Sequence, residues 1–398
     1  MLGHVHVSTY GAWKDVGTWY WGLAKEQLNP DDEVRRKALE LTRGLTTDQE
    51  KVRAIYGWVV KRTRYVALEF GIYGYKPRRA SQTLARGWGD CKDKATLIVS
   101  MLQVVGIPAN LVIVRTALRG AFPTEPASLA PFDHAIAYVP SLNLYLDGTA
   151  EYTGSTEFPA FDRDSMALVI HPQDSRLVTL PDPPASETER NKVLRATLAA
   201  DGSARVTMNY EASGAIAAQW RLRYHGENTR RDRIAADMAQ NLPGFVMDAG
   251  NAGLESSDLE DIEQPVRLRT TGRSPNFARR QGDELSVPVA PQDRFVARFA
   301  SLSQRRQDVV LPYRSTIEEA WTIELPAGMK VRESPSSHNL STPFGSFLLE
   351  VKPGAKAVEV RTRVTLDKKR IKPTEYAAFA KFCEQIDRAL NQRMILGK

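Results

Sequence analysis

The stretch GDCKDKATLIVSMLQVVGIP, residues 89–108, decides the fold that we expect for the first half of the chain. Its apolar residues recur at helical spacing, and the closing Gly-Ile-Pro ends the pattern. Asp90 is a favourable N-cap residue with Asp93 three positions later, so Cys91 should be the first residue of the helix. Backbone amides and the dipole at a helix start favour a thiolate and can donate to an oxyanion. The alternative interpretation is that Cys91 is a small buried apolar residue.

The residues before this stretch predict a helical half of a domain. One helix should open at residues 31–34 and end near Gly44. A second should start at the capping box of residues 47–50, because its Thr and Glu side chains satisfy free amides at a helix start. A short helix is expected at residues 81–85, after a loop rich in Gly, Tyr and Pro.

The residues after it predict strands that carry two further polar groups. Residues 109–116 form one expected strand, and residues 134–139 and 142–147 form a hairpin across Pro140-Ser141. A tight turn there places His134 directly opposite Asp147 on one sheet face. Proline cannot supply the positive φ of the favoured turns, so a longer loop is the alternative, and a register shift of two residues keeps both side chains on one face. A histidine beside a carboxylate matches the base and orienter of a nucleophilic site.

Four motifs in this order resemble bacterial transglutaminase-like proteins: residues 73–77, 89–95, 132–135 and 146–149. The resemblance covers about residues 30–180. It implies an α+β, papain-like core in which the Cys-bearing helix packs on an antiparallel sheet that bears the His and the Asp. It also implies Cys91, His134 and Asp147 as catalytic triad, with Trp88 as a candidate aromatic neighbour of the thiol. No cofactor is expected, and no carboxylate loop has calcium-ligand spacing.

A Pro-rich segment divides the chain into two expected domains. Residues 1–180 form the transglutaminase-like catalytic domain, residues 181–190 the linker, and residues 191–398 a β-rich domain of unassigned role. The second domain should close with a helix at residues 375–390, whose apolar face carries Cys383. We expect that thiol to be inert, and we find no catalytic motif in this half.

Composition limits the classes of partner. The net charge is +7 and the pI about 9.3, but Arg and Lys are spread among Asp and Glu, so no nucleic-acid partner is expected. The densest basic cluster should be a solvated helix face; its residues are Arg221, Arg223, Arg230, Arg231 and Arg233. Three charged residues near the site could line its cleft, although solvated positions are expected for them; they are Glu69, Lys92 and Lys94.

Export and membrane insertion leave no signal in the sequence. No apolar run is long enough to span a membrane, and the start lacks the pattern of a signal peptide. The chain opens almost directly on an aromatic cluster, which is typical of the middle of a longer protein. We therefore leave the compartment open: the chain as written should be soluble, and a fragment of an exported, periplasmic protein is one expectation.

The expected activity is thiol-dependent acyl transfer at the amide carbonyl of a protein or peptide substrate, through a thioester on Cys91. Two alternatives stay open. One is a cysteine peptidase or amidase that hydrolyses a peptide or isopeptide bond, and the other is a peptide-binding module with a vestigial site. Tyr75 and Gln82 are candidates for a second oxyanion donor, although packing roles suit them equally.

Overall fold

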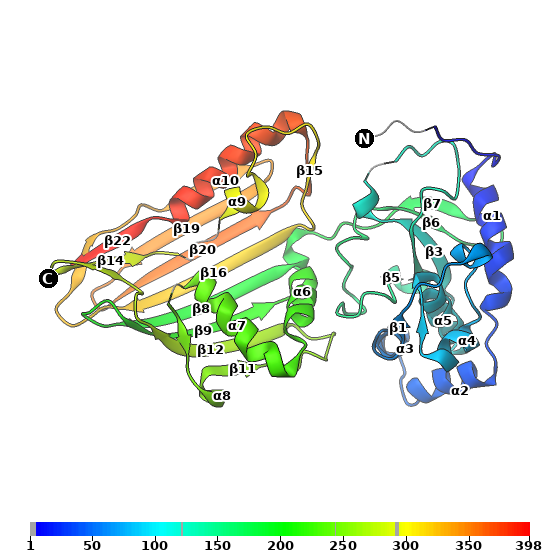
Figure 1. Cartoon of the computed structure of the whole chain (residues 1–398), viewed down its shortest axis with the longest axis horizontal. Coiled ribbons are helices and arrows are strands. Elements are labelled where there is room, and N and C mark those ends of the chain that lie inside the picture. Colours follow the sequence, from blue (N-terminus) through cyan, green and yellow to red (C-terminus); the bar gives the residue numbers. More distant parts are fainter. Residues whose placement is uncertain (1–4, 121, 243, 291–293) are drawn as a thin grey trace. The chain divides into compact units, whose positions relative to one another are not determined.

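The computed structural model describes residues 5–120, 122–242, 244–290 and 294–398 (Figure 1). The chain divides into two compact units, Met1–Asp182 and Pro183–Lys398. The boundary falls within the Pro-rich segment at residues 181–184. Strand β8 (Glu189–Leu198) already begins inside the stretch that the sequence predicts as linker. Among the described residues, no helix combines the length and the apolar character that a membrane crossing needs.

The first unit begins with helices whose ends are set by local capping. Asp31 accepts a hydrogen bond from the Val34 amide, and Thr47 and Glu50 form the predicted capping box. The helices are α1 (Trp13–Ala24), α2 (Asp32–Leu41), α3 (Asp48–Arg62), α4 (Ala80–Arg86) and α5 (Cys91–Val104). Helix α5 is the central one, because every residue from Cys91 to Leu102 is buried. An all-buried helix needs neighbours on every side, and the other helices and the sheet supply them.

A five-stranded antiparallel sheet in the order β5-β4-β3-β6-β7 completes the first unit. Its strands are β3 (Asn110–Arg115), β4 (His134–Val139), β5 (Leu144–Leu146), β6 (Met166–Val169) and β7 (Arg176–Thr179). Helix α5 packs on β4 and β3. The sheet also carries an apolar cluster built around Val112, Ile136 and Phe158. This helix-on-sheet core is the arrangement that positions the site.

The second unit is built on a nine-stranded, mainly antiparallel sheet in the order β10-β12-β9-β8-β16-β20-β19-β18, with β11 also paired to β12. Burial alternates along its strands, as a sheet with one packed face requires. Helix α6 packs on β8 and β12, and α10 packs on β19 (Figure 1). The bounds are β9 (Ala204–Ala212), α6 (Gly214–Tyr224), α7 (Glu227–Asn241), β10 (Val246–Met247), α8 (Gly250–Gly253), β11 (Leu254–Ser256), β12 (Val266–Ser274), β16 (Ser315–Glu324), β18 (His338–Thr342), β19 (Gly345–Pro353), β20 (Ala357–Leu366) and α10 (Tyr376–Leu390).

Smaller sheets extend this unit. One has the order β13-β14-β22-β17, and another pairs β15 with β21. Their strands, with the remaining helix, are β13 (Arg279–Gln281), β14 (Glu284–Pro288), α9 (Phe295–Phe299), β15 (Val309–Val310), β17 (Lys330–Glu333), β21 (Arg370–Ile371) and β22 (Arg393–Gly397). The predicted α+β class is confirmed, with a β-rich second half and a helix near its end. One strand, β22, follows that helix and pairs back with β14 and β17.

Two local expectations are wrong. Strands β4 and β5 are joined by a longer turn in which Asn143 takes the left-handed conformation, and Ala137 pairs with Leu146. The register is therefore shifted by two residues from a Pro140-Ser141 turn, since proline cannot provide the positive φ. Arg221 is not on a solvated face: it is 0% exposed and donates to the Gln264 carbonyl at 2.6 Å.

Candidate active site

The nucleophile candidate lies at a helix start whose cap is built as the sequence predicts. Cys91 is the first residue of α5, and Asp90 accepts a hydrogen bond from the Asp93 amide while Asp93 reaches back to the Asp90 amide. Gly89 is needed beside this cap, because a Cβ there would lie 2.6 Å from the Asp93 Cβ. Cys91 itself is 7% exposed. The free amides of the first turn surround its position, which favours negative charge on sulfur or on a bound oxyanion.

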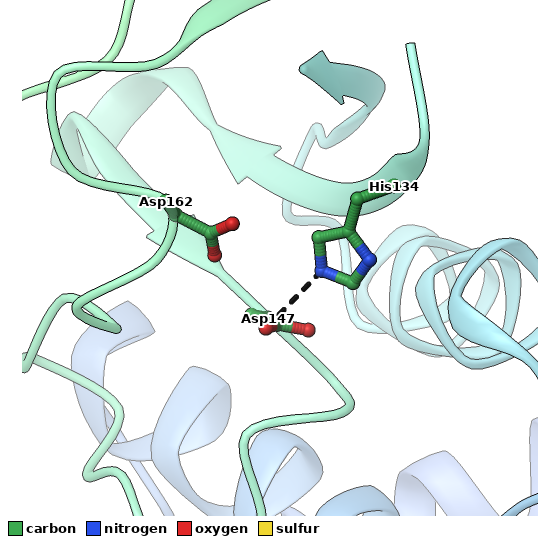
Figure 2. A group of neighbouring side chains, drawn as sticks. All are labelled: His134, Asp147 and Asp162. Carbon is green, nitrogen blue, oxygen red and sulfur yellow. Dashed lines mark ion pairs between the residues drawn. The ribbon is translucent and has the colours of Figure 1, made fainter. Parts of the chain in front are cut away.

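His134 and Asp147 come together at the end of the β4–β5 hairpin. The Nε2 atom of His134 lies 3.2 Å from Oδ2 of Asp147, and the Asp147 side chain is fully buried (Figure 2). His134 is the first residue of β4, and Asp147 follows the last residue of β5. The shifted register still leaves both side chains on one face, because the shift is an even number of residues.

The Asp147 carboxylate is held from several sides. Thr149 donates its amide and its hydroxyl to Oδ1, each at 2.8 Å. Tyr56 of α3 donates to the Asp147 carbonyl at 3.2 Å. Gly148 allows the chain to pass close to α5, since a Cβ there would lie 3.0 Å from the Cβ of Lys94. These contacts fix the carboxylate in place.

The pair is electrostatically matched. Burial lowers the pKa of the His134 imidazole, but the Asp147 charge and hydrogen bonds with Asp147 and Cys91 outweigh it, so the pKa is well above its ordinary value. Burial raises the pKa of Asp147, but the charge of His134 and the hydrogen bonds from His134 and Thr149 lower it below its ordinary value. The arrangement therefore favours an imidazolium between Cys91 and a carboxylate.

A cavity of about 230 Å³ opens beside these groups. Cys91 and His134 line it, together with Tyr20 of α1, Tyr75 and Phe132. Burial, and then the charges of Cys91 and Asp90, raise the pKa of Tyr20. Its place on α1, far from the motifs in sequence, gave no signal that it belongs here.

Several sequence expectations about the surroundings need correction. Lys92 and Lys94 are 4% and 0% exposed, not solvated. The Lys92 ammonium forms an ion pair with Asp90 at 2.6 Å. The Lys94 ammonium donates a hydrogen bond to the backbone carbonyl of Thr63 at 2.6 Å. They are buried because α5 is enclosed on all sides, which its local sequence does not reveal. Glu69 is half exposed and contacts Lys92 at 3.5 Å.

Only one of the other candidate neighbours of the thiol lines the cavity. Tyr75 lines the cavity, whereas Trp88 and Gln82 are outside its lining. Trp88 instead lies beneath the guanidinium groups of Arg78 and Arg86. Cys383 is 0% exposed on the apolar face of α10, and burial, followed by the Asp387 charge, raises its pKa to about 12.

One residue at the site escaped the sequence reasoning altogether. Asp162, in the irregular segment between β5 and β6, is 0% exposed. One of its carboxylate oxygens, one oxygen of Asp147 and a ring nitrogen of His134 lie within 4.8 Å of one another (Figure 2). Phe161 beside it packs edge-on against the His134 ring. Asp162 belongs to no periodic pattern, and nothing in the sequence distinguishes it from nearby Asp164.

Comparison with known families agrees with this architecture. Residues 35–141 match the family model of the transglutaminase-like superfamily core. Residues 284–396 match DUF3858, a domain of unknown function with a solved structure. The chain thus carries a transglutaminase-like core followed by DUF3858. No curated protein matches the chain.

Comparison with solved structures gives one likeness in fold that reaches through both units. A "putative protease" from Parabacteroides distasonis aligns over 98% of this chain with a TM-score of 0.59 and 18% identity, and this chain spans 59% of that protein's chain. A "putative cysteine protease" from Cytophaga hutchinsonii aligns over 31% of this chain and 41% of its own, with 23% identity and a TM-score of 0.23. The first likeness extends through both units, and at this identity it speaks to the fold alone.

Proposed function

We propose that the first unit is a thiol-dependent acyltransferase that acts at an amide carbonyl of a peptide or protein, with Cys91 as nucleophile, His134 as acid and base, and Asp147 as orienter. The observation that carries this proposal is the 3.2 Å contact between buried Asp147 and His134 beside a helix-start cysteine. The match of residues 35–141 to the transglutaminase-like core supports it.

The proposed first half-reaction forms a thioester. The Cys91 thiolate attacks the carbonyl carbon, a C–S bond forms, and the oxyanion is stabilised by amides of the α5 start. The imidazolium of His134 gives the proton on its nitrogen away from Asp147 to the leaving amine as the C–N bond breaks. Asp147 keeps the ring in the tautomer that makes this transfer direct.

The second half-reaction returns the thiolate. An amine attacks the thioester, His134 accepts its proton, and the C–S bond breaks to leave a new amide. Water in place of the amine gives hydrolysis with the same groups and the same proton transfers. We keep hydrolysis as the second candidate because the structurally similar Parabacteroides protein is described as a "putative protease".

The experiment incubates the full chain with a defined pool of glutamine- and lysine-containing peptides and follows products by mass spectrometry. Loss of ammonia with new crosslinks is expected for transfer, and new termini or deamidated side chains for hydrolysis. Peptides that bind but remain unchanged would overturn the enzyme and leave a binding module.

Three variants make that result specific. Cys91→Ser should end product formation. Asp147→Asn should keep the fold, by circular dichroism, and lower turnover by as much as about 10⁴-fold, because an amide cannot hold the imidazolium. Asp174→Asn changes an exposed carboxylate of the same unit and should leave the rate unaltered. Wild-type turnover in Asp147→Asn would remove the orienter role.

A further inference from the structure

The hydrogen bonding of the buried Asp162 carboxylate requires an explanation. It is 0% exposed, and within the described part of the chain neither of its carboxylate oxygens has a hydrogen-bond partner. Buried polar side chains are almost always paired, so an exception of this kind calls for an explanation. Its position beside His134 and Asp147 makes that explanation relevant to the site (Figure 2).

The chemistry of the nearest groups indicates which protonation state of Asp162 can form a hydrogen bond. An ionised Asp162 can only accept hydrogen bonds. The adjacent Asp147 carboxylate also only accepts, and the Nε2 atom of His134 lies 3.2 Å from Oδ2 of Asp147. A protonated Asp162 acquires a donor, and the Asp147 carboxylate is an acceptor within 4.8 Å. Protonation therefore turns an unsatisfied neighbour into a bonding partner.

Burial and the surrounding charges also favour the protonated form of Asp162. The titratable groups that face Asp162 are Asp147, His134 and Asp133. Burial, and then the negative charge of Asp147, raise the pKa of Asp162 well above its ordinary value, although His134 opposes them. Lys94 faces Asp147 from α5, but its ammonium is bonded to a backbone carbonyl. A second carboxylate charge is thus poorly compensated here.

We infer that Asp162 is a positioning residue of this site: as a neutral carboxylic acid it donates its O–H to Asp147 and holds that carboxylate toward His134. The inference rests on the proposed function. Thr149 already directs Oδ1 of Asp147, and Asp162 would restrain the carboxylate from a further side. Because the acid is neutral, it orients Asp147 without adding a second negative charge beside the imidazolium.

A divalent cation is the competing explanation, since one imidazole nitrogen and two carboxylates form an acceptable ligand set. That ion would require an ionised Asp162 and an Nε2 without its proton, and it would replace the contact between His134 and Asp147. The neutral acid preserves that contact, and we therefore prefer it. The two explanations predict opposite results for zinc.

The direct test is infrared spectroscopy of the full chain at neutral pH. We expect the carbonyl band of a protonated carboxylic acid, and its loss in Asp162→Asn. A spectrum in which wild type and Asp162→Asn do not differ in this band would overturn the inference. Because this measurement needs no turnover, it stands or falls separately from the proposed enzyme activity.

The second readout is the titration of the His134 ring by NMR, assigned with His134→Gln. Asn is neutral and its amide can still donate to Asp147, so Asp162→Asn should move the His134 pKa by less than about 0.3 unit. If Asp162 were ionised, removal of its charge would lower that pKa by about 1 unit or more. A shift of that size would overturn the inference.

Thiol reactivity separates positioning from packing. With iodoacetamide at about pH 6, Asp162→Leu should slow alkylation of Cys91 about tenfold, while Asp162→Asn restores the wild-type rate. Equal slowing in both variants would contradict the donor role. Titration of Cys91→Ser protein with zinc chloride should show no binding that depends on Asp162; binding that Asp162→Asn abolishes would establish the cation site instead. If Asp162→Leu does not fold, the Asn variant still decides the outcome.

Discussion

Each unit contains a cluster of buried charged residues, around Glu319 in the second unit and around His134 in the first. The two clusters differ in how completely each buried charge has a partner of opposite charge or a hydrogen bond. In the second unit, the Glu319 carboxylate is 2% exposed and receives Arg190 at 2.9 Å, Lys192 at 3.1 Å and the Trp321 indole at 3.0 Å. Lys192 also lies over the rings of Trp321 and Tyr210. Burial lowers the pKa of Lys192, but Glu319 outweighs it and the net direction is upward.

The cluster of the first unit is compensated only in part. His134 and Asp147 lie 3.2 Å apart as an ion pair, whereas the oxygens of Asp162 have no hydrogen-bond partner among the described residues. A low-dielectric interior strengthens paired charges and makes unpaired ones costly. A cluster in which every charged group has a partner stabilises one structure. A cluster in which one titratable group has no partner favours a change in the protonation state of that group. The difference is the one expected if the Glu319 cluster serves stability and the His134 cluster serves the proposed chemistry.

The two cysteines sharpen this comparison and give the largest expected effect. Cys91 lies at a helix start beside His134, and Cys383 is buried in the middle of α10 with a raised pKa of about 12. Since the thiolate is the reactive form, iodoacetamide at about pH 6 should label Cys91 on the order of a thousandfold faster. Peptide mapping after timed quenching measures both rates in one sample.

Two controls accompany that measurement. His134→Ala should slow the labelling of Cys91, because the imidazolium beside the sulfur is gone. Denaturation should make the two cysteines nearly equal. Slow labelling of both native thiols, unaffected by His134→Ala, would make Cys91 an ordinary buried residue.

The Glu319 cluster gives an effect of intermediate size, this time on stability. Glu319→Gln leaves Lys192 buried without its charge partner and should lower the free energy of unfolding of the second unit by about 3–5 kcal/mol. The double variant Lys192→Met, Glu319→Leu should lose much less, since no uncompensated charge remains. Urea unfolding followed by tryptophan fluorescence measures both.

The matched control is Glu324→Gln, at an exposed position of the same strand, β16, which should change stability by less than about 0.5 kcal/mol. A Glu319→Gln protein as stable as this control would show that water reaches Lys192. The contrast between the two clusters would then be lost.

The smallest effect is a dependence of stability on pH. The folded pKa of Asp162 is raised above the unfolded value of about 3.9, so the folded chain keeps a proton that the unfolded chain releases. Stability from this group is therefore present below about pH 4 and is lost as pH rises toward the folded pKa, by at most about 1.4 kcal/mol per pH unit. Asp162→Asn removes this loss, and its advantage over wild type should grow above pH 4.

Asp147 gives the opposite sign in the same experiment. Its folded pKa is lowered, so it stabilises the fold above about pH 4 and the stabilisation is lost as pH falls through the folded value. The loss of stability in Asp147→Asn relative to wild type should therefore be largest above pH 4. Thermal unfolding from about pH 2 to 7 tests both, because the loss for Asp147 falls below about pH 4 and the loss for Asp162 above it; Asp174→Asn is the exposed control. Parallel curves for Asp162→Asn and wild type would mean that Asp162 ionises normally.

Local sequence rules were sufficient for the parts of the site that lie within one element. The N-cap at Asp90 and the capping box with Asp93 placed Cys91 at a helix start, because capping depends on residues three positions apart. The alternation of strand residues placed His134 and Asp147 on one face even though the predicted turn was wrong, since an even shift of register preserves the face. These predictions depended only on neighbours along the chain.

The sequence by itself thus determined the helix start, the order of the motifs and the shared face of the hairpin. Only the tertiary structure decided which charges are buried. Lys94 and Arg221 are 0% exposed although each stands in a stretch that is polar in sequence, and Asp162 is brought beside His134 from an irregular segment. Burial is set by which distant elements pack over a residue. That information belongs to the whole fold, and it is where the compensation of each buried charge, and with it the difference between the two clusters, is determined.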